Sequence, residues 1–506
     1  MSRVELSARY GKDSAQQFDS RECQNMVPSY YETGTGKGSY KYSSVWGYEH
    51  VEEIGRGDFF HGSYVVQPNK YSSSERLFCL NGLDLYEVFS NGTSTLRATL
   101  TGFINSDAIV RFADNGLVMC IVSGGGDAWF YDLSSASTAS LITDPDFPST
   151  VIDVVYIDTY FVWLEGRGSG NRIFISDNYA TDPANCVNAL DFTVAESQPD
   201  NAIRLMVLNG ELLVFGNTTI EFYYNSGNVD FPFDINKGVT QNIGCFSPNS
   251  IVKMDNIIVF NGKTSASNNG IYVLSNYQLQ EISDKYIVQA LYGYSSTKMS
   301  SISLKEDFSY FYCFYLNNLM YCYDFSTGLW STRTQENALG VTVPYGSRIS
   351  SSFFGYNYFF STAIIPINTV SNIFIQKKDI YTTDEVTNNT TLAPIEKINI
   401  SRKLILPNIS QENKNIQINR FEMDIQKGVG NVDDADPEIS LSMSRDGGMT
   451  YGNARALKIG ASGAYRGRVK ASMLGTARDA VFKIESDSPV QQEWFCAYID
   501  YEVMDE

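Results

Sequence analysis

The residues able to carry chemistry are few and widely spaced in this sequence of 506 residues. Its two histidines, His50 and His61, do not accompany a serine or cysteine in a pattern typical of an activated nucleophile. Adjacent carboxylates such as Asp433-Asp434 fit solvated turns better than the acid/base pair of a glycosidase, which only a three-dimensional separation identifies. No cluster of His and Cys has the spacing of metal ligands. We therefore predict no catalytic, cofactor-binding or metal-binding residues, no cofactor, and a protein that is not an enzyme.

Two short motifs look chemical but are better explained as loops. Residues 444–451 read Ser-Arg-Asp-Gly-Gly-Met-Thr-Tyr, which resembles the structural Asp-box hairpin of sialidases. In such a turn Asp446 accepts backbone hydrogen bonds and Gly448 supplies a conformation that other residues adopt with difficulty. The glycine-rich stretch 34–38 superficially resembles a phosphate-binding loop. It has Tyr31 in place of the first glycine and Gly38 in place of the metal-binding Ser or Thr, so we predict a flexible loop.

The cysteines and the apolar pattern indicate a protein that folds in a reducing compartment. None of the eight cysteines forms a Cys-x-x-Cys pair and most lie inside apolar runs, so we predict reduced, buried thiols. The first residues have no apolar signal core, and no run of 18 apolar residues predicts a membrane span. The eight positions are Cys23, Cys79, Cys120, Cys186, Cys245, Cys313, Cys322 and Cys496.

The charge of the chain is strongly acidic but uneven. A formal net charge of −19 argues against a general nucleic-acid binder, because phosphate neutralisation requires Lys and Arg. The charge is explained either by solubility alone or by a wall along which DNA passes without adhering. Residues 440–483 nevertheless contain eight basic and two acidic side chains. This segment is either a solvated face or an interface to an acidic partner ring or neighbouring subunit. The basic residues are Arg445, Arg455, Lys458, Arg466, Arg468, Lys470, Arg478 and Lys483.

A repeat of hairpins sets the architecture. The 33 Tyr, 30 Phe and 39 Gly residues favour strands and turns, and no long stretch has helical spacing. From Tyr71 onward, an apolar strand, a polar turn and a second apolar strand recur. The pair Asn209-Gly210 between two such strands is the strongest local hairpin signal. Successive turns are 43, 51, 46, 52 and 48 residues apart, and lie at Asn115, Asp158, Asn209, Asp255, Asp307 and Gly355.

This spacing predicts an all-β fold with a β-propeller of about six blades, each of about four strands. We expect strands Arg76–Leu80 and Leu83–Phe89 to close the ring by pairing near Ile373–Tyr381. A large β-sandwich, or several, is the alternative, and the regular spacing argues against it. The expected domains are residues 1–65, which pack with the C-terminal platform domain; residues 66–385, the propeller; and residues 386–506, a linker and a C-terminal β domain.

The residue composition of the chain changes after Thr382. Residues 382–399 are polar and rich in Asn and Thr, which predicts a linker or an exposed loop. Apolar residues then alternate from Ile416 to Ile425 as in a half-buried strand, with a slip at Asn419-Arg420 that predicts a β-bulge. Further strands are expected at Ile439–Met443 and Val481–Ile484. The N-terminal and C-terminal segments together are expected to form the additional β domain.

Four stretches of the chain, taken in order, share a pattern with a known family. They are Cys23, Asn25 and Pro28; then Ala195-Glu196, Pro199-Asp200, Gly210-Glu211-Leu212, Phe215-Gly216, Glu221, Tyr224, Gly227, Phe231-Pro232-Phe233, Gly244-Cys245, Pro248 and Ser250-Ile251-Val252; then Asp324 to Trp330; then Asp446-Gly447-Gly448, Thr450-Tyr451, Gly460, Gly463, Tyr465, Arg468, Leu474-Gly475, Arg478 and Val481-Phe482. Together they resemble the packaged-DNA stabilisation protein of short-tailed bacteriophages, also called the tail hub or nozzle. Tyr451 replaces a usual Trp, and residues 365–411 match no part of the family pattern.

The resemblance implies a virion structural protein of the phage tail that is assembled in the host bacterial cytoplasm. Such proteins form a ring, expected to be hexameric, below the portal and the head-tail adaptor. They extend the DNA channel, retain the packaged DNA without sequence-specific binding, and anchor tail fibres, tailspikes or a needle. Two other functions stay open at this point. They are a propeller glycan hydrolase that acts on host surface sugar, and a receptor-binding tail protein.

Overall fold

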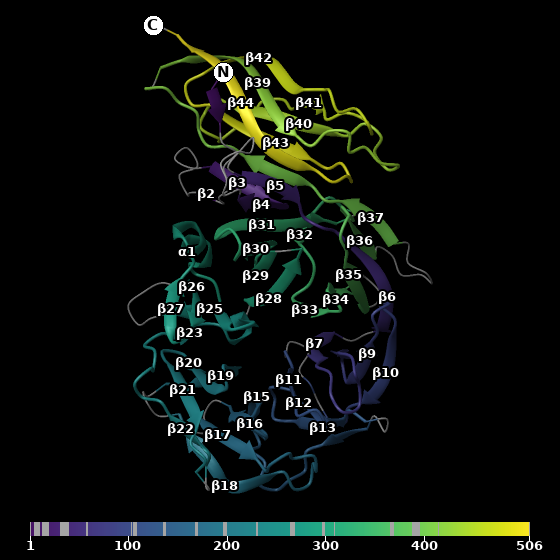
Figure 1. Cartoon of the computed structure of the whole chain (residues 1–506), viewed down its shortest axis with the longest axis vertical. Helices are drawn as coiled ribbons and strands as arrows, with labels where there is room; N and C mark the ends of the chain where they lie inside the picture. Colours follow the sequence, from purple (N-terminus) through teal and green to yellow (C-terminus); the bar gives the residue numbers. More distant parts are fainter. Residues whose placement is uncertain are drawn as a thin grey trace. The chain divides into compact units, whose positions relative to one another are not determined.

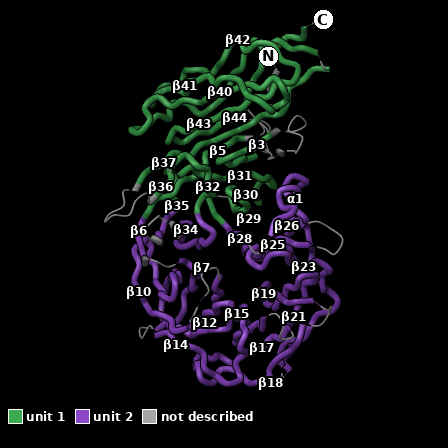
Figure 2. Tube along the Cα trace, turned by 180° about the vertical axis from the view of Figure 1, so that it is seen from behind, with its two compact units in different colours: residues 1–50, 304–346, 376–506 green, residues 51–303, 347–375 purple. Residues whose placement is uncertain are grey.

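The computed structural model shows two compact units (Figure 2). Unit 1 consists of residues 1–50, 304–346 and 376–506, and unit 2 of residues 51–303 and 347–375. The expected domain limits near residues 65 and 385 stay a prediction. The structure describes residues 2–4, 11–12, 20–30, 40–56, 59–102, 104, 109–134, 138–166, 171–195, 200–228, 231–263, 269–295, 299–307, 309–337, 339–364, 369–386, 395–412 and 414–504.

Unit 2 is built from antiparallel four-stranded meanders, with the first strand of each toward the middle and the last at the rim (Figure 1). Its strands are β7 (Phe60–Val66), β8 (Arg76–Asn81), β9 (Asp84–Val88) and β10 (Ser94–Thr99); β11 (Arg111–Asp114), β12 (Val118–Val122), β13 (Ala128–Asp132) and β14 (Ala139–Leu141); β15 (Val151–Ile157), β16 (Tyr160–Glu165), β17 (Arg172–Ser176) and β18 (Val187–Val194); and β19 (Ala202–Leu208), β20 (Glu211–Gly216), β21 (Ile220–Asn225) and β22 (Phe233–Ile235).

A fifth sheet and a sixth continue the pattern in unit 2. The fifth contains β23 (Gly244–Cys245), β24 (Val252–Met254), β25 (Ile257–Lys263), β26 (Gly270–Ser275) and β27 (Gln278–Glu281). The sixth contains, in order, β33 (Ile349–Phe353), β34 (Tyr356–Ile364), β35 (Thr369–Gln376, which ends in unit 1) and β6 (Tyr48–Arg56, which begins in unit 1). A 3-10 turn at Pro248–Ser250 and helix α1 (Lys285–Leu291) flank the fifth sheet. In the described residues α1 is the single α-helix, and no helix there is long and apolar enough to cross a membrane.

The turns predicted from the sequence form the hairpins of these sheets. Asn209 and Gly210 both have positive φ, 52° and 81°, as a two-residue turn of the I′ type requires. Apolar faces of neighbouring sheets then pack on each other, since one sheet cannot bury both of its own faces. For example, Phe130 of β13 and Phe161 of β16 have ring centroids 5.4 Å apart, and Phe215 and Phe260 are also 5.4 Å apart. The predicted β-propeller fold is confirmed.

The ring-closing strands differ from those we predicted. Strands β8 and β9 are the middle of the first sheet, and β6 is the strand that lies next to β35. The residues involved are nevertheless close, because Leu77 and Cys79 of β8 pack in one core with Ile373 and Ile375 of β35. The prediction was therefore right about packing and wrong about pairing. The sequence did not reveal the first sheet as a repeat because a long connection, residues 67–75, replaces its inner tight turn.

Unit 1 contains most of a seventh meander and a β-sandwich. Its strands are β28 (Ser300–Glu306, which begins in unit 2), β29 (Ser309–Leu316), β30 (Leu319–Asp324), β31 (Leu329–Glu336) and β32 (Thr342–Pro344); β36 (Thr382–Val386) and β37 (Ile395–Asn399); β1 (Ser2–Val4), β4 (Met26–Tyr30), β5 (Tyr40–Ser44), β39 (Ile416–Ile425), β42 (Val469–Ala477) and β44 (Glu493–Val503); and β2 (Gly11–Lys12), β3 (Ser20–Gln24), β38 (Arg402–Ile405), β40 (Glu438–Ser444), β41 (Arg455–Lys458) and β43 (Val481–Ser486).

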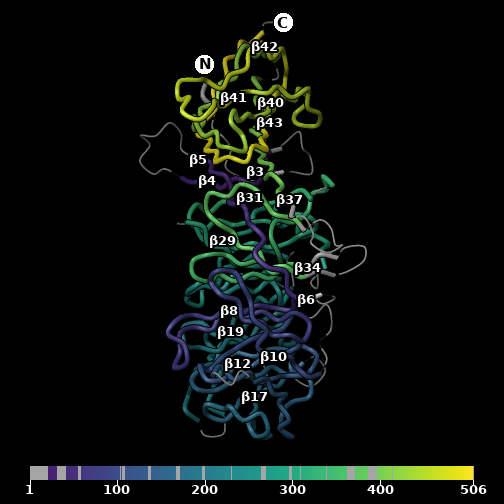
Figure 3. The backbone as a smooth tube through the Cα atoms, turned by 90° about the vertical axis from the view of Figure 1, so that its right-hand side faces the viewer, coloured from purple at the N-terminus to yellow at the C-terminus, as the bar shows by residue number. Residues whose placement is uncertain are grey.

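The sandwich core joins two sheets that contain strands from both ends of the chain. Phe421 of β39 and Phe482 of β43 contact each other across the core with ring centroids 5.0 Å apart. Strand β1 pairs with β44, and β3 pairs with β38, so N-terminal segments complete both C-terminal sheets. Figure 3 shows the N-terminal strands β3, β4 and β5 next to the C-terminal segments, and β5 pairs with β44. The expected joint β domain is therefore present. The predicted bulge is confirmed as well, because the register of β39 shifts between Ile418 and Arg420.

Two expectations about polar segments have different outcomes. The predicted linker at 382–399 contains β36 and β37, which pair antiparallel from Thr382↔Asn399 to Val386↔Ile395, so that prediction was wrong at both ends of the segment. The sequence hid these strands because their residues are mostly polar or charged and lack the apolar alternation of a half-buried strand. All eight cysteines are free and buried, as predicted.

Candidate interaction sites

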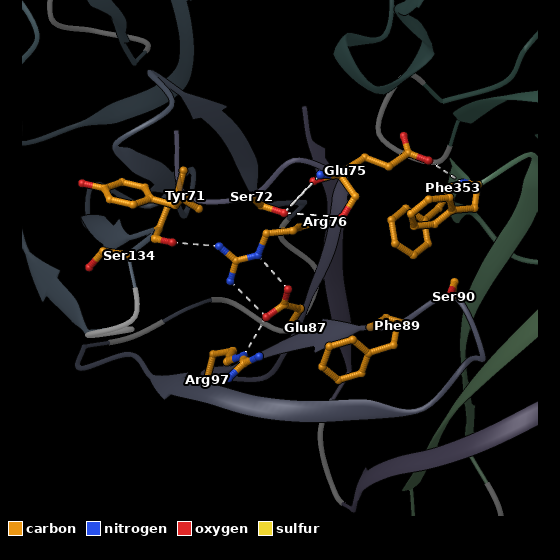
Figure 4. A pocket seen from close by; sticks show the side chains of 14 residues that line it. Tyr71, Ser72, Glu75, Arg76, Glu87, Phe89, Ser90, Arg97, Ser134 and Phe353 are labelled. Atoms are coloured by element: carbon orange, nitrogen blue, oxygen red, sulfur yellow. Dashed lines mark hydrogen bonds and ion pairs between the residues drawn. The ribbon is translucent and has the colours of Figure 1, made fainter. Parts of the chain in front are cut away.

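A pocket of about 720 Å³ lies beside the first sheet of unit 2 (Figure 4). The connection between β7 and β8 supplies one wall, and the ends of β9 and β13 supply the floor and a side. The tip of the β33–β34 hairpin closes it with Phe353 and Phe354. A volume of this size accommodates a small molecule.

The pocket floor is an ion-paired trio of Arg76, Glu87 and Arg97. Arg76 donates from Nε and Nη2 to the two oxygens of Glu87, at 2.7 and 3.0 Å, and Arg97 Nε donates to the same carboxylate at 2.7 Å. Burial alone would raise the pKa of Glu87, but the hydrogen bonds and charges of both arginines outweigh it and lower that pKa. The same hydrogen bond raises the pKa of Arg76. Glu87 is therefore a fixed anion rather than a proton donor.

The rim of the pocket carries exposed aromatic rings. Tyr71, Phe89 and Phe354 are 42%, 38% and 47% exposed, although large apolar side chains are usually buried. Phe354 has a φ of 48°, a conformation that is a genuine outlier for a bulky residue. Its backbone N–H donates to Glu75 Oε1 at 2.6 Å, which holds the turn in place.

The basic residues predicted between 440 and 483 lie around β41 and β42 of the sandwich, and all except the half-buried Lys483 are exposed. Two of them brace the fold. Arg455 donates to the carbonyls of Ser472 and Met473 at 2.6 and 3.1 Å, and Arg445 donates to that of Leu474 at 3.1 Å. Of the others, Lys458 pairs with Asp436, Arg468 with Glu422 and Lys483 with Glu485. Arg466, Lys470 and Arg478 are exposed and form no ion pair within the described residues, so these three are available for a partner.

The Asp-box forms the turn between β40 and β41. Asp446 accepts hydrogen bonds from the backbone N–H and the hydroxyl of Thr450, and from the hydroxyl of Ser444 at 2.6 Å. These bonds, led by that of Ser444, lower the pKa of Asp446 to about 2. Gly448 has a φ of 97°, which only glycine adopts readily. The motif is structural here, because its carboxylate is fully engaged within the turn.

A third polar group lies on the innermost strands of unit 2. Asp153 of β15 is 3.4 Å from Arg204 of β19 and accepts the backbone N–H of Leu205 at 2.7 Å. Burial raises the pKa of Asp153 to about 6, and the charge of Arg111 on β11 opposes this. Arg111 also donates to Asn249 Oδ1 at 2.5 Å. The group ties several inner strands together.

The remaining positions singled out in the sequence do not converge. His61 is buried on β7 of unit 2, whereas His50 lies on β6 in unit 1, where its backbone N–H donates to Asp384. Asp433 and Asp434 lie in a turn, where Asn431 accepts both of their backbone N–H groups. In the described part of the chain, no group of three or more His, Cys, Asp or Glu residues is arranged to hold a metal ion. Tyr31, the glycine-rich stretch 34–38, Glu196 and Pro199 lie outside the described residues.

Sequence reasoning did not find the pocket. In its floor, Glu87 pairs with Arg76 and Arg97, which are 11 and 10 positions away in the sequence. The hairpin tip at Phe354 is 279 positions from Glu75, its partner in the pocket, and only the closed ring of sheets brings the two together. One signal was present: the turn near Gly355 has Phe where other inner turns have Asn or Asp.

A propeller of four-stranded meanders and a β-sandwich in one chain define the class: a propeller-and-sandwich protein. The chain belongs to the family of bacteriophage P22 Gp10. The family model of the β-propeller matches residues 10–337, and that of the β-sandwich matches residues 401–502. The protein is thus a structural protein of the phage tail that stabilises DNA, and the resemblance inferred from the sequence is confirmed.

Similar solved structures are more distant. The WD40 β-propeller domain of Doa1 is 10% identical with a TM-score of 0.39, and the alignment covers 66% of this chain and 98% of that one. The Pan2 WD40 domain of Neurospora crassa is 9% identical with a TM-score of 0.41, and the alignment covers 66% of this chain and 96% of that one. BamB from Moraxella catarrhalis is 9% identical with a TM-score of 0.36, and the alignment covers 65% of this chain and 98% of that one. With TM-scores below 0.5, these structures carry no argument about this chain. No curated protein sequence matches the chain.

Proposed function

We propose that this tail protein is the hub, or nozzle, of a short tail: a ring, expected to be hexameric, below the portal and head-tail adaptor. The ring extends the DNA channel, retains the packaged DNA, and anchors fibres, spikes or a needle. The observation that carries the proposal is the separation of charge along the chain. Residues 51–303 and 347–375, which form unit 2, contain 14 Lys and Arg against 27 Asp and Glu, whereas residues 440–483 contain eight against two.

Opposite charges on two surfaces of one chain support contact between unlike surfaces of neighbouring copies. Such head-to-tail contacts generate a ring when the rotation closes. They also steer association and weaken with salt. An acidic propeller gives DNA phosphates no general binding surface, which fits a channel wall that retains DNA without adhering to it.

The test is the mass of the purified full chain, alone and with its adaptor, at low and high salt. We expect a closed ring in negative-stain images and a mass that is a multiple of the chain mass. Changing the exposed Arg466, Lys470 and Arg478 to Glu should prevent ring formation. The matched control changes the exposed Lys70, Lys237 and Lys285 of unit 2 to Glu and alters the net charge equally.

The proposal fails if the protein stays monomeric with its adaptor under all salt conditions. It also fails if both triple variants assemble like the wild type. A glycan hydrolase gains no support from the Asp-box, because Asp446 is engaged within its own turn.

A further inference from the structure

The pocket beside the first sheet has a lining that its tail role does not require. Two arginines and two glutamates cancel in charge, although the surrounding unit is acidic. Serine hydroxyls at Ser72, Ser74 and Ser90 add small polar groups between the rings. The lining thus offers flat apolar surfaces beside hydrogen-bonding groups with no net charge.

This chemistry excludes several ligands. A phosphate or nucleic acid requires unpaired cations, but Arg76 and Arg97 already share Glu87. An apolar peptide anchor prefers a mostly apolar pocket, but nine of the 14 residues that line this pocket carry a charged or hydroxyl group. A sugar ring fits both features, since one face presents C–H groups to an aromatic ring while its hydroxyls need donors and acceptors at the edge.

The pocket contains a hydrogen-bond donor for the hydroxyls at the edge of a sugar ring. Arg97 uses Nε for Glu87, and among the described residues its Nη atoms have no hydrogen-bond partner. The Arg97 guanidinium also lies 6.0 Å from the centroid of the Phe89 ring, so a donor and a stacking surface are adjacent (Figure 4). Planar guanidinium groups suit neighbouring hydroxyls because they donate two hydrogen bonds in parallel.

The position of Phe354 is the strongest indication of a ligand. A left-handed backbone is strained for phenylalanine, and strained residues concentrate at ligand-binding sites. The equivalent turns at Asn209 and Asp255 have residues that tolerate this conformation. At Phe354 a ring is retained instead, half exposed and held at the pocket by Glu75.

We propose that this pocket binds a short saccharide, of two or three sugar rings, and does not cleave it. Phe354, Phe89 and Tyr71 stack on the sugar faces, and Arg97 donates to hydroxyls. Cleavage would need a carboxylic acid that gives up a proton beside a free carboxylate. Glu87 is held ionised by two arginines and Glu75 accepts a backbone N–H, so the pair is not available for that chemistry. The glycans of a bacterial surface are the natural source of such a ligand.

The test uses the full chain on a printed array of bacterial surface glycans, followed by saturation-transfer NMR with the oligosaccharides that bind. The key variant is Phe354→Gly, which removes the ring and relieves the backbone, so its fold is preserved. Tyr179→Gly is the matched control, because Tyr179 has a φ of 52°, is 58% exposed and lies outside the pocket.

We expect Phe354→Gly and Arg97→Gln each to weaken binding at least tenfold, with an unchanged or higher thermal midpoint for Phe354→Gly. Tyr179→Gly should bind like the wild type, and no shorter product should appear on prolonged incubation. Three results would each overturn the proposal: absence of binding across the array, binding by both pocket variants as strong as that of the wild type, or binding of a tail-fibre peptide alone at this pocket. Ring assembly is measured separately, so either proposal can fail without the other.

Discussion

Removing Arg333 should destabilise unit 1 more than any other single substitution among its charged residues. Arg333 of β31 is fully buried, and Glu306 of β28 is 6% exposed. The guanidinium donates to both carboxylate oxygens, one of them at 3.0 Å, and Gln376 Nε2 donates to Glu306 at 2.6 Å. Phe311 stacks on the guanidinium at 4.6 Å. Burial alone would lower the pKa of Arg333, but Glu306 outweighs it and raises that pKa.

The magnitude follows from what Arg333→Met leaves behind. The methionine fills most of the volume, but Glu306 becomes a buried carboxylate without its counter-ion. Breaking a buried pair in this way costs about 3–5 kcal/mol. For a unit of this size, each kcal/mol shifts the unfolding midpoint by roughly 2–4 °C, so a fall of about 6–20 °C is expected. Removing both partners with Arg333→Met and Glu306→Leu should recover most of this loss, because no isolated charge remains.

Calorimetry and urea unfolding of the single, double and wild-type proteins measure the coupling between the two residues. Lys378→Met is the matched control, since Lys378 pairs with Asp307, directly after Glu306, but both side chains are about half exposed. That variant should leave the midpoint unchanged. A loss below about 1 kcal/mol for Arg333→Met, or a double variant as unstable as the single one, would refute the claim that the cost arises from leaving the Glu306 carboxylate buried without its counter-ion.

Three further predictions follow from the titratable groups. Asp153 has a pKa of about 6 in the folded protein against 3.8 when free, so its contribution to stability is fully present below pH 3.8 and is lost as pH rises through 6. Relative to the wild type, Asp153→Asn should therefore gain up to about 3 kcal/mol between pH 3 and pH 8 in urea unfolding. For Asp446 the pH dependence of stability has the opposite sign, because its pKa is lowered to about 2. Asp446→Asn should therefore remove the part of the acid destabilisation that develops between pH 4 and pH 2, and amide hydrogen exchange in the 444–451 turn measures this change. Burial raises the pKa of Cys23, Cys120 and Cys245 to about 12, so iodoacetamide at pH 8 should label none of the eight buried thiols until the protein unfolds, as mass spectrometry would show.

The repeated hairpins were readable from the sequence because their information is local. An Asn-Gly turn and two apolar strands fix a hairpin regardless of what packs on it, and six such turns revealed six of the seven meanders in the described chain. The bulge at Asn419-Arg420 was visible for the same reason, since a slip in alternation is a local event. The first meander was not recognised in the sequence, because a long connection, residues 67–75, joins its first two strands in place of a tight turn.

The interaction sites could not be read in this way because they depend on closure of the ring. Glu75 and Phe354 are 279 residues apart, and nothing in either neighbourhood indicates the other. The same holds for Glu306, whose partner Arg333 and second donor Gln376 come from different strands. Charged residues inside apolar runs were the available hint, but a sequence does not state which of them pair.

The distribution of charge constrains how a protein of this family can stabilise DNA. Electrostatic adhesion to phosphates would need unpaired Lys and Arg, and unit 2 has about half as many basic as acidic residues. Several of its arginines, such as Arg76, Arg97 and Arg172, are moreover bound to carboxylates of their own sheets. An acidic propeller can oppose the passage of DNA by its shape, but not by binding the phosphates. Retention of DNA by this chain should therefore not weaken as salt neutralises phosphate contacts, whereas assembly through the basic residues 440–483 should.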